Sequence, residues 1–420
     1  MDSKLIYDWN KAGVGAFHVD RPIQVDDETL RDGLQSPSVR DPSIAEKIAI
    51  LHIMEDLGID MLDMGLPGAG PRAVAHVENL AREIVRCRMN IKANCAARTH
   101  PNDIRPIADI RDRTGLPIEV AMFLGSSPIR RYTEDWTDDF LLRTTETGVK
   151  CARALDLEVM YVTEDTTRCD PETVRRLYTT AIECGARAVT IADTCGHATP
   201  MGAYAVTKFV KEIIRESGRE VRLDWHGHCD RGLGVANALA AIQAGADCVH
   251  GTALGIGERV GNLQMDQLLV NLKLMGVPPW KDQNLEKLKD YCYAVSKATE
   301  VPIPKNYPIF GEDAFRTATG VHAAAIIKAF RKGDFELVNN VYSGVPSHYF
   351  GLEQVIEIGP MSGKSNVIFW LERHGIEATD ELVDRIFHRA KTSDRVLTEL
   401  EILSLCQEEK TVRSHPLTRK

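Results

Sequence analysis

The sequence of 420 residues lacks the features that would place it in a membrane or on nucleic acid. No apolar run approaches the roughly 20 residues that a membrane-spanning helix needs. The first 13 residues mix charged with apolar side chains and do not resemble a signal peptide. The net charge of −9 is mild for this length and indicates neither a nucleic-acid partner nor an anionic membrane surface. We therefore expect a cytoplasmic protein.

Paired cysteines are also missing. The ten cysteines are scattered singly, without any C-x-x-C pair, which is typical of reduced thiols in a cytosol. This distribution argues against a disulfide framework and against a structural zinc site. Hydrophobic residues make up 44% of the chain and charged residues 26%, and both values are ordinary for a globular enzyme.

Short apolar segments alternate with segments of helical periodicity along the first two thirds of the chain. Three of the predicted helices end at a glycine, at Gly58, Gly185 and Gly245, as left-handed helix stops do. Eight strand–helix units in series predict an α/β fold, a (β/α)8 TIM barrel, because parallel strands need crossover helices. A doubly wound open sheet is the structural alternative. The predicted strands span residues 23–30, 59–66, 91–96, 118–124, 157–162, 188–192, 221–225 and 248–254.

Beyond about residue 279 the alternation stops, and a mainly helical C-terminal region is expected. We expect a catalytic barrel with a short N-terminal extension at 1–284. A linker and first helical subdomain would span 285–355, and a second helical subdomain with a charged tail would span 356–420. A proline-rich stretch at 301–305 is typical of a rigid linker.

The pair His226 and His228 is the strongest local signal. Side chains at positions i and i+2 of a strand point to the same face, so both rings would project into one space. The alternative is a pair of strand histidines satisfied by neighbours. In a barrel, functional groups lie at the C-terminal ends of the strands, where Asp32 follows the first strand and the histidines end the seventh. Two histidines and one carboxylate would leave coordination positions open for a bidentate ligand such as an α-keto acid.

Three further residues at this end of the predicted barrel have two interpretations each. Arg31 would stabilise an oxyanion, or it forms a structural ion pair with Asp32. Glu164, after the fifth strand, would be a general base or would orient a ligand, or it is an exposed loop carboxylate. We interpret Cys229 as a small buried residue rather than a metal ligand.

Three separated motifs carry a family resemblance. The segments Arg31-Asp32-Gly33-Leu34-Gln35, His226-x-His228 and Gly255-Ile256-Gly257-Glu258-Arg259-Val260-Gly261-Asn262 resemble those of the DRE-TIM metallolyases. Within that superfamily the chain is similar, from about residue 20 to about residue 375, to the Claisen-type 2-isopropylmalate, citramalate and homocitrate synthases. The three motifs fall on the expected strands in the expected order.

The resemblance implies a divalent metal, with Mg2+ or Mn2+ favoured and Zn2+ possible, and acetyl-CoA as co-substrate. It also implies a homodimer in which His322 and Tyr342 reach the barrel of the partner. By resemblance, the residues that hold the metal are Asp32, His226, His228 and Asn262; the catalytic residues are Arg31, Glu164, His322 and Tyr342; and the substrate-binding residues are Gln35, His100, Thr163 and Thr194.

Several positions depart from the pattern of the resembled synthases. Cys229 stands where an Asn is usual, and 323–325 reads Ala-Ala-Ala where the motif usually continues with x-Asp-Gly. Met160 stands where homocitrate synthases have an Arg, and an apolar group cannot pair a buried carboxylate. Ala121 stands where isopropylmalate synthases often have a His. Arg130 and Arg131 could supply a charge instead, or they form a solvated loop pair.

The resemblance leaves the acceptor open among 2-oxoisovalerate, pyruvate and 2-oxoglutarate. We favour 2-oxoisovalerate, which would give 2-isopropylmalate for leucine biosynthesis, and we expect no C-terminal leucine-binding regulatory domain. A second class is the carbon–carbon lyase of the 3-hydroxy-3-methylglutaryl-CoA type, which has a catalytic Cys after the eighth strand. Residues 251–262 contain no Cys. A barrel that senses a metal or metabolite without catalysis is the third class.

Overall fold

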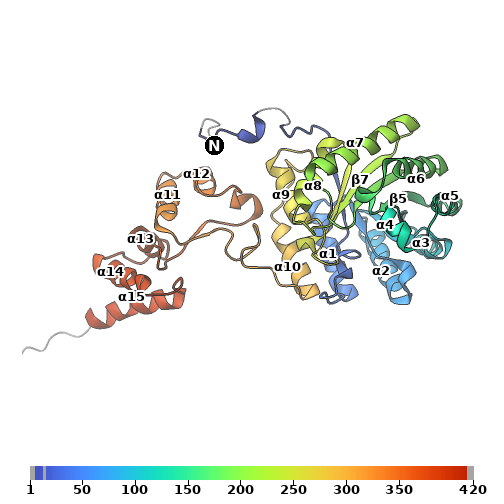
Figure 1. The fold of residues 1–420 in the computed structure, drawn as a ribbon. Coiled ribbons are helices and arrows are strands. Elements are labelled where there is room, and N and C mark those ends of the chain that lie inside the picture. The colour runs from blue at the N-terminus through green and yellow to red at the C-terminus, as the bar shows by residue number, and fades with distance from the viewer. Residues whose placement is uncertain (1–4, 13–15, 414–420) are drawn as a thin grey trace, which may run out of the picture. The chain divides into compact units, whose positions relative to one another are not determined.

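The computed structural model describes residues 5–12 and 16–413, and it divides the chain into two compact units (Figure 1). The first unit is Asp8–Pro302, and the second contains the described residues of Ile303–Lys420 and Met1–Tyr7. The division falls after helix α10 (Leu288–Thr299), which packs against α1 (Ile44–Leu57). The sequence had suggested a boundary at residue 284, and its proposed division of the C-terminal region at residue 355 stays a prediction.

The first unit is a closed barrel of eight parallel strands in the order β1 to β8, with β8 paired to β1. This confirms the predicted TIM barrel and excludes the open sheet. Strands β4 and β5 share the longest register, from Glu119 opposite Glu158 to Gly125 opposite Glu164. The strands are β1 (Gln24–Asp27), β2 (Met61–Asp63), β3 (Lys92–Arg98), β4 (Ile118–Gly125), β5 (Glu158–Glu164), β6 (Ala188–Asp193), β7 (Arg222–Gly227) and β8 (Cys248–Gly251).

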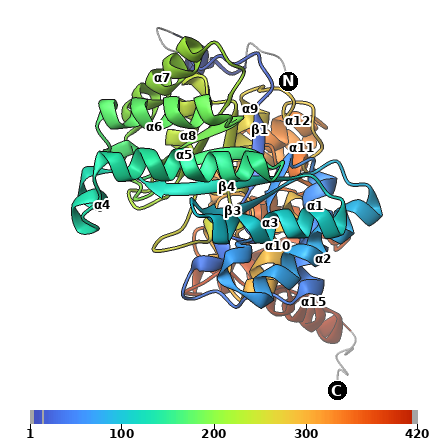
Figure 2. The same ribbon diagram turned by 90° about the vertical axis from the view of Figure 1, so that its right-hand side faces the viewer.

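Helices lie outside the strands, and Figure 2 shows α5, α6 and α7 side by side on one flank. Helix α1 begins with a capping box between Ser43 and Glu46 and ends at Gly58 in the left-handed conformation. Gly185 and Gly245 end α6 and α8 in the same way, as the sequence predicted. The remaining helices of this unit are α2 (Pro71–Cys87), α3 (Pro101–Thr114), α4 (Pro128–Thr133), α5 (Asp138–Ala154), α6 (Pro171–Cys184), α7 (Pro200–Ser217), α8 (Gly234–Ala244) and α9 (Met265–Leu274).

The interior of the barrel combines apolar and charged residues. Ala121, Met160 and Ala188 form an apolar cluster inside it. Close to this cluster the strands also bury ionisable side chains, which is costly unless each finds a partner. The buried ionisable groups on or beside the strands include Asp26, Asp27, Glu28, Asp63, Asp224 and His250.

The second unit is mainly helical, as the sequence predicted. It also contains a two-stranded parallel sheet of β9 (Arg316–Thr317) and β10 (Val355–Ile356). One core cluster gathers Ala323, Ile326 and Phe369, and another gathers Trp370, Ile386 and Ile402. The end of the charged tail, at 414–420, lies outside the described residues. The helices are α11 (Gly320–Arg331), α12 (Phe335–Asn340), α13 (Lys364–Arg373), α14 (Asp380–Lys391) and α15 (Glu399–Arg413). None of the described helices of either unit is long and apolar enough to cross a membrane.

Candidate active site

The predicted histidine pair lies at the C-terminal end of β7, beside Asp32. The rings of His226 and His228 have centroids 5.2 Å apart. Asp32 Oδ2 lies 3.6 Å from His228 Nε2 and 3.9 Å from His226 Nε2. Ligand atoms of these three residues all lie within 4.8 Å of one another. The structure therefore brings the predicted metal-binding side chains together from strands one and seven.

Asn262 joins this group through the backbone. It forms an isolated antiparallel bridge with His228, and its side-chain Nδ2 donates to the carbonyl of Ile256 at 3.1 Å. Its Oδ1 is left buried without a hydrogen-bond partner among the described residues, as is Asp32 Oδ2. Buried oxygens without donors are costly, and hard divalent cations take such oxygens as ligands. The donor set of two imidazoles, one carboxylate and one amide oxygen fits a divalent cation.

The electrostatics of the pair also suit a metal. Burial, and then the neighbouring His226, lower the pKa of His228 to about 4. A neutral imidazole is the form that coordinates a metal. His228 is therefore prepared to bind a cation without first losing a proton at neutral pH.

Arg31 forms the structural ion pair that the sequence suggested, and its role toward an oxyanion stays a prediction. Its guanidinium contacts Asp32 Oδ1 and Asp63 Oδ2 at 2.6 Å each, and Glu28 Oε1 at 3.1 Å. It is thus a structural ion-pair partner, yet it also lines the cavity beside the histidines. Its three carboxylate contacts fix the guanidinium at the edge of that cavity.

A cavity of about 280 Å³ opens next to the histidines. Arg31, Asp32, His226 and His228 line it together with Glu28, His250 and Glu258. Most of the rest of the wall is apolar, which suits an apolar group on a ligand whose polar end meets the cation. This wall consists of Leu66, Ala96, Ala121, Phe123, Met160, Val162 and Ala192.

Glu164 also lines the cavity, at the end of β5. Burial raises the pKa of its carboxyl, and Arg130, whose Nε lies 3.7 Å from Glu164 Oε1, partly offsets that rise. Arg130 is therefore not a purely solvated loop residue. Arg131 instead contacts Asp138 and Thr173.

The four residues predicted to bind substrate divide into two groups. Gln35 and Thr194 line the cavity. Thr163 does not, because its hydroxyl lies among those of Thr166 and Tyr178, away from the cavity. His100 is exposed and caps α3, where its Nδ1 accepts from the backbone N–H of Asn102. The positions of Thr163 and His100 do not support the roles expected for them.

His322 and Tyr342 belong to the second unit, where their ring centroids lie 4.2 Å apart. Both side chains are exposed. The structure thus brings these two residues together, and their contribution to catalysis stays a prediction.

Cys229 is buried, as expected from the sequence, and belongs to none of the metal-ligand groups found among the described residues. Its Sγ donates to the backbone carbonyl of Asn262 at 3.1 Å. Burial raises the pKa of this thiol to about 11, so that it stays protonated at neutral pH. Cys229 therefore supports the segment that carries Asn262 rather than binding a metal itself.

Sequence reasoning gave no role to several charged residues that the structure places at this site. They are Glu28, Asp63, His250 and Glu258, which contact Arg31 or His226 or line the cavity. A signal was available for three of them, because a charged or imidazole side chain inside a predicted buried strand needs a partner. Glu28, Asp63 and His250 all lay within such predicted strands.

Fold and site together define a (β/α)8-barrel protein with a candidate divalent-metal centre at the C-terminal ends of its strands. Residues 22–292 match the HMGL-like family, and the chain belongs to that family. The homocitrate synthase AksA of Methanopyrus kandleri is 31% identical over 371 residues, covering 88% of this chain and 87% of the relative. The 2-isopropylmalate synthase of Geobacillus sp. (strain WCH70) is 30% identical, covering 93% of this chain and 74% of the relative.

Solved structures agree on the fold. The HMG-CoA lyase of Bacillus subtilis superposes with a TM-score of 0.57 at 18% identity, covering 68% of this chain and 96% of that structure. At this identity the likeness concerns the barrel architecture alone.

Proposed function

We propose that this protein catalyses a metal-dependent Claisen condensation of acetyl-CoA with a 2-oxo acid. The observation that carries the proposal is the group Asp32, His226 and His228, set beside Arg31 at the edge of a cavity with a largely apolar wall, together with the buried, unpartnered Oδ1 of Asn262, whose backbone pairs with His228. The relatives named as homocitrate and 2-isopropylmalate synthases support the same reaction class.

Asp32, His226, His228 and Asn262 would hold the ion. A bound divalent cation supplies Lewis acidity, which polarises the keto group of the acceptor. Arg31 stabilises the negative charge that develops on the keto oxygen as the new bond forms. Its three carboxylate contacts hold its guanidinium in place before the reaction begins.

A base must remove a proton from the methyl group of acetyl-CoA. Glu164, or the His322 and Tyr342 pair, is proposed for this step. The resulting enolate carbon forms the bond to the keto carbon of the acceptor, and the keto oxygen takes up a proton. Water then cleaves the thioester and releases free CoA. We further propose a homodimer in which His322 and Tyr342 act at the barrel of the partner.

The acceptor is proposed to carry an apolar side chain, with 2-oxoisovalerate and the product 2-isopropylmalate as the leading case. Met160, Phe123 and Val162 line the cavity, where a second carboxylate would have to be buried against apolar atoms. This supports 2-oxoisovalerate over 2-oxoglutarate. Pyruvate, with its smaller methyl group, would leave part of the apolar wall without contact.

A thiol-release assay with acetyl-CoA tests the proposal. It is run with 2-oxoisovalerate, pyruvate and 2-oxoglutarate in turn, with and without a chelator. We expect CoA release that is greatest with 2-oxoisovalerate and is lost on metal removal, and a loss of at least ~10³-fold in His226→Ala. Release that His226→Ala does not reduce would overturn the metal centre. Absence of release with every acceptor would overturn the condensation.

A further inference from the structure

A chain of buried charged side chains runs through the barrel interior, away from the candidate metal centre. From Arg31 the contacts pass to Glu28, then to His250, and then to Asp224. Arg222 holds Asp224 at 2.8 Å and in turn contacts Glu119 at 2.9 Å. The residues come from four strands or their ends, β1, β4, β7 and β8, and none of them is more than about a fifth exposed.

Glu28 is the branching point of this chain. Its Oε2 lies 2.8 Å from His226 Nδ1, and its Oε1 accepts from Arg31 Nη2 at 3.1 Å and contacts His250 Nδ1 at 3.0 Å. One carboxylate therefore contacts a proposed metal ligand, the proposed oxyanion-stabilising residue and a buried histidine. Its side chain is only 6% exposed, so water does not replace these partners.

The contact with His226, at 2.8 Å, favours one of the two ring nitrogens as the metal ligand. A carboxylate beside Nδ1 favours the tautomer that carries its proton there, which leaves the Nε2 lone pair free. His226 Nε2 is the atom that faces Asp32 Oδ2, at 3.9 Å. Glu28 thus favours the orientation and the tautomer that metal binding needs.

His250 keeps Glu28 in place from the other side. It is 2% exposed and lies among three carboxylates, with Nδ1 3.0 Å from Glu28 and Nε2 3.4 Å from Asp224 and 3.9 Å from Asp26. Arg222 contacts both carboxylate oxygens of Asp224 through its Nε, at 2.9 Å and 3.0 Å. Each buried charge in the chain therefore has an opposite charge beside it, which is the condition for keeping it inside a barrel.

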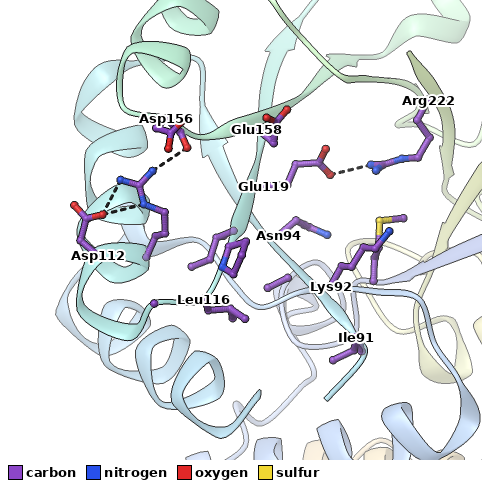
Figure 3. A pocket seen from close by; sticks show the side chains of 15 residues that line it. Ile91, Lys92, Asn94, Asp112, Leu116, Glu119, Asp156, Glu158 and Arg222 are labelled. Atoms are coloured by element: carbon purple, nitrogen blue, oxygen red, sulfur yellow. Dashed lines mark hydrogen bonds and ion pairs between the residues drawn. The ribbon is translucent and has the colours of Figure 1, made fainter. Parts of the chain in front are cut away.

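The far end of the chain reaches a second cavity, of about 710 Å³, at the N-terminal ends of the strands. Figure 3 shows Glu119 and Arg222 pointing toward one another at its edge, with Asn94 nearby. Asn94 also donates to the buried Asp26 at 2.7 Å. In TIM barrels the chemistry lies at the C-terminal ends of the strands and not at this end, so the functional end of this series of charged contacts is at Glu28.

We propose that Glu28 is a positioning residue of the metal centre, which orients His226 toward the cation and holds Arg31 beside it, with His250 as its anchor. This inference rests on the metal centre of the proposed function. It adds a residue that lies outside the proposed ligand set and that acts through His226 and Arg31.

Manganese affinity of the purified full-length protein tests the inference without reference to turnover. Free Mn2+ is measured by electron paramagnetic resonance during titration of wild type, Glu28→Gln and Asp32→Asn. We expect Glu28→Gln to bind Mn2+ about 10- to 100-fold more weakly, as is typical when a partner of a metal-ligating histidine is lost. Asp32→Asn should lose binding at this site. Glu28→Asp, which keeps the charge, should recover part of the affinity.

The matched control is Glu83→Gln. Glu83 is another largely buried carboxylate that contacts a histidine and an arginine, His52 at 2.7 Å and Arg86 at 2.5 Å, but it lies on α2. Glu83, His52 and Cys87 lie close enough together to form a separate metal-ligand group, so the comparison is made on the Asp32-dependent binding alone. The substitution should leave that affinity within about twofold of wild type, because independent sites behave additively.

Each result has a distinct meaning. Wild-type affinity in a folded Glu28→Gln, alongside lost binding in Asp32→Asn, would overturn the role of Glu28 and leave the metal centre standing. Equal binding by wild type and Asp32→Asn would overturn the metal centre and the inference with it. If Glu28→Gln does not fold, His250→Gln takes its place. It removes the anchor but keeps the carboxylate, so an affinity equal to that of wild type would overturn the inference.

Discussion

At the scale of single residues, Glu164 and Arg130 form a pair with a measurable pH signature. Burial raises the pKa of the Glu164 carboxyl, and the Arg130 guanidinium, with Nε 3.7 Å from Oε1, lowers it. A general base works only when ionised, so activity that depends on Glu164 rises as the pH increases through this raised pKa. The free energy of unfolding has the opposite pH dependence to the activity. A carboxyl group whose pKa is raised in the folded protein stabilises it at low pH, and this stabilisation is lost as the pH rises through the raised pKa.

We predict that Arg130→Gln moves the acidic limb of the kcat/KM profile to higher pH, since the cation that favours the ionised Glu164 carboxylate is gone. The measurement is a pH series of CoA release with the preferred acceptor. Arg131→Gln is the matched control, because Arg131 contacts Asp138 and Thr173 instead of Glu164. A limb that stays in place in Arg130→Gln would exclude Glu164 as the base.

Residue positions were predictable from the sequence only where strand alternation was clear. His226 and His228 follow the i, i+2 rule, and the structure places both beside Asp32. The same rule argues against Thr163, because Val162 and Glu164 line the cavity on either side of it. Glu28 and His250 could be recognised as unusual, since both are charged positions in buried strands. The contact between Glu28 and His250 could not be predicted, because it joins a residue that follows the first strand of the barrel to one in the last strand.

At the scale of elements, the loop between β8 and α9 determines where Asn262 lies. Gly261 has φ of 96°, a left-handed conformation that favours glycine. The Asn262 N–H donates to the carbonyl of Gly255 at 3.0 Å, and the Gly261 carbonyl accepts from the Cys229 N–H at 3.0 Å. A Cβ on Gly261 would lie only 1.8 Å from the Gly255 oxygen. A side chain there would force the Gly255 carbonyl, which accepts the hydrogen bond from Asn262, to shift.

We predict that Gly261→Ala destabilises the protein by more than ~2 kcal/mol, through backbone strain and the clash, and weakens Mn2+ binding at least tenfold. Gly276→Ala is the control, because Gly276 has φ of 75° and a Cβ there meets nothing within 4 Å. It should cost only about 1 kcal/mol, from strain alone, with unchanged Mn2+ affinity. Urea unfolding and the manganese titration measure the two effects, and equal metal binding by both variants would contradict this role of the loop.

Elements were predicted in type and order, while their ends were less certain. All eight strands lie within or close to their predicted ranges, yet β1 is Gln24–Asp27 where the apolar pattern suggested 23–30. The pattern continued because residues 28–30 are buried too, although they form a loop. Burial determines where an apolar pattern stops, whereas hydrogen bonds to neighbouring strands define where a strand stops. The predicted end of the strand therefore differs from its end in the structure. Glycine stops were more reliable, since Gly58, Gly185 and Gly245 need a left-handed conformation that other residues adopt reluctantly.

At the scale of the whole molecule, the barrel was predictable and the boundary of the first unit was not. The barrel follows from a local alternation repeated eight times. Helix α10 looks like the start of the helical region when only its periodicity is considered. Its partner α1 lies more than 230 residues earlier in the chain, so their packing cannot be read from the local pattern. A boundary placed by periodicity alone therefore falls before α10, and the structural division falls after it.

The proposed homodimer makes a prediction about two inactive variants. If His322 acts at the barrel of the partner, then Asp32→Asn and His322→Ala chains complement one another when co-expressed with different affinity tags. The mixed dimer contains one site with an intact Asp32 on one chain and an intact His322 on the other. Random pairing makes half of the dimers mixed, with one working site in two, so the mixture should recover about a quarter of wild-type activity.

Purification through both tags in sequence isolates the mixed dimer, which should then show about half of the wild-type rate per dimer. The double variant Asp32→Asn/His322→Ala, co-expressed with wild type, is the matched control. In that mixed dimer each site contains one substituted residue if His322 acts on the partner, so it should be inactive. If His322 serves the barrel of its own chain, the outcomes reverse. The first pair then gives no activity, and the dimer of wild type with the double variant keeps half, so the two arrangements are distinguished by which mixed dimer releases CoA.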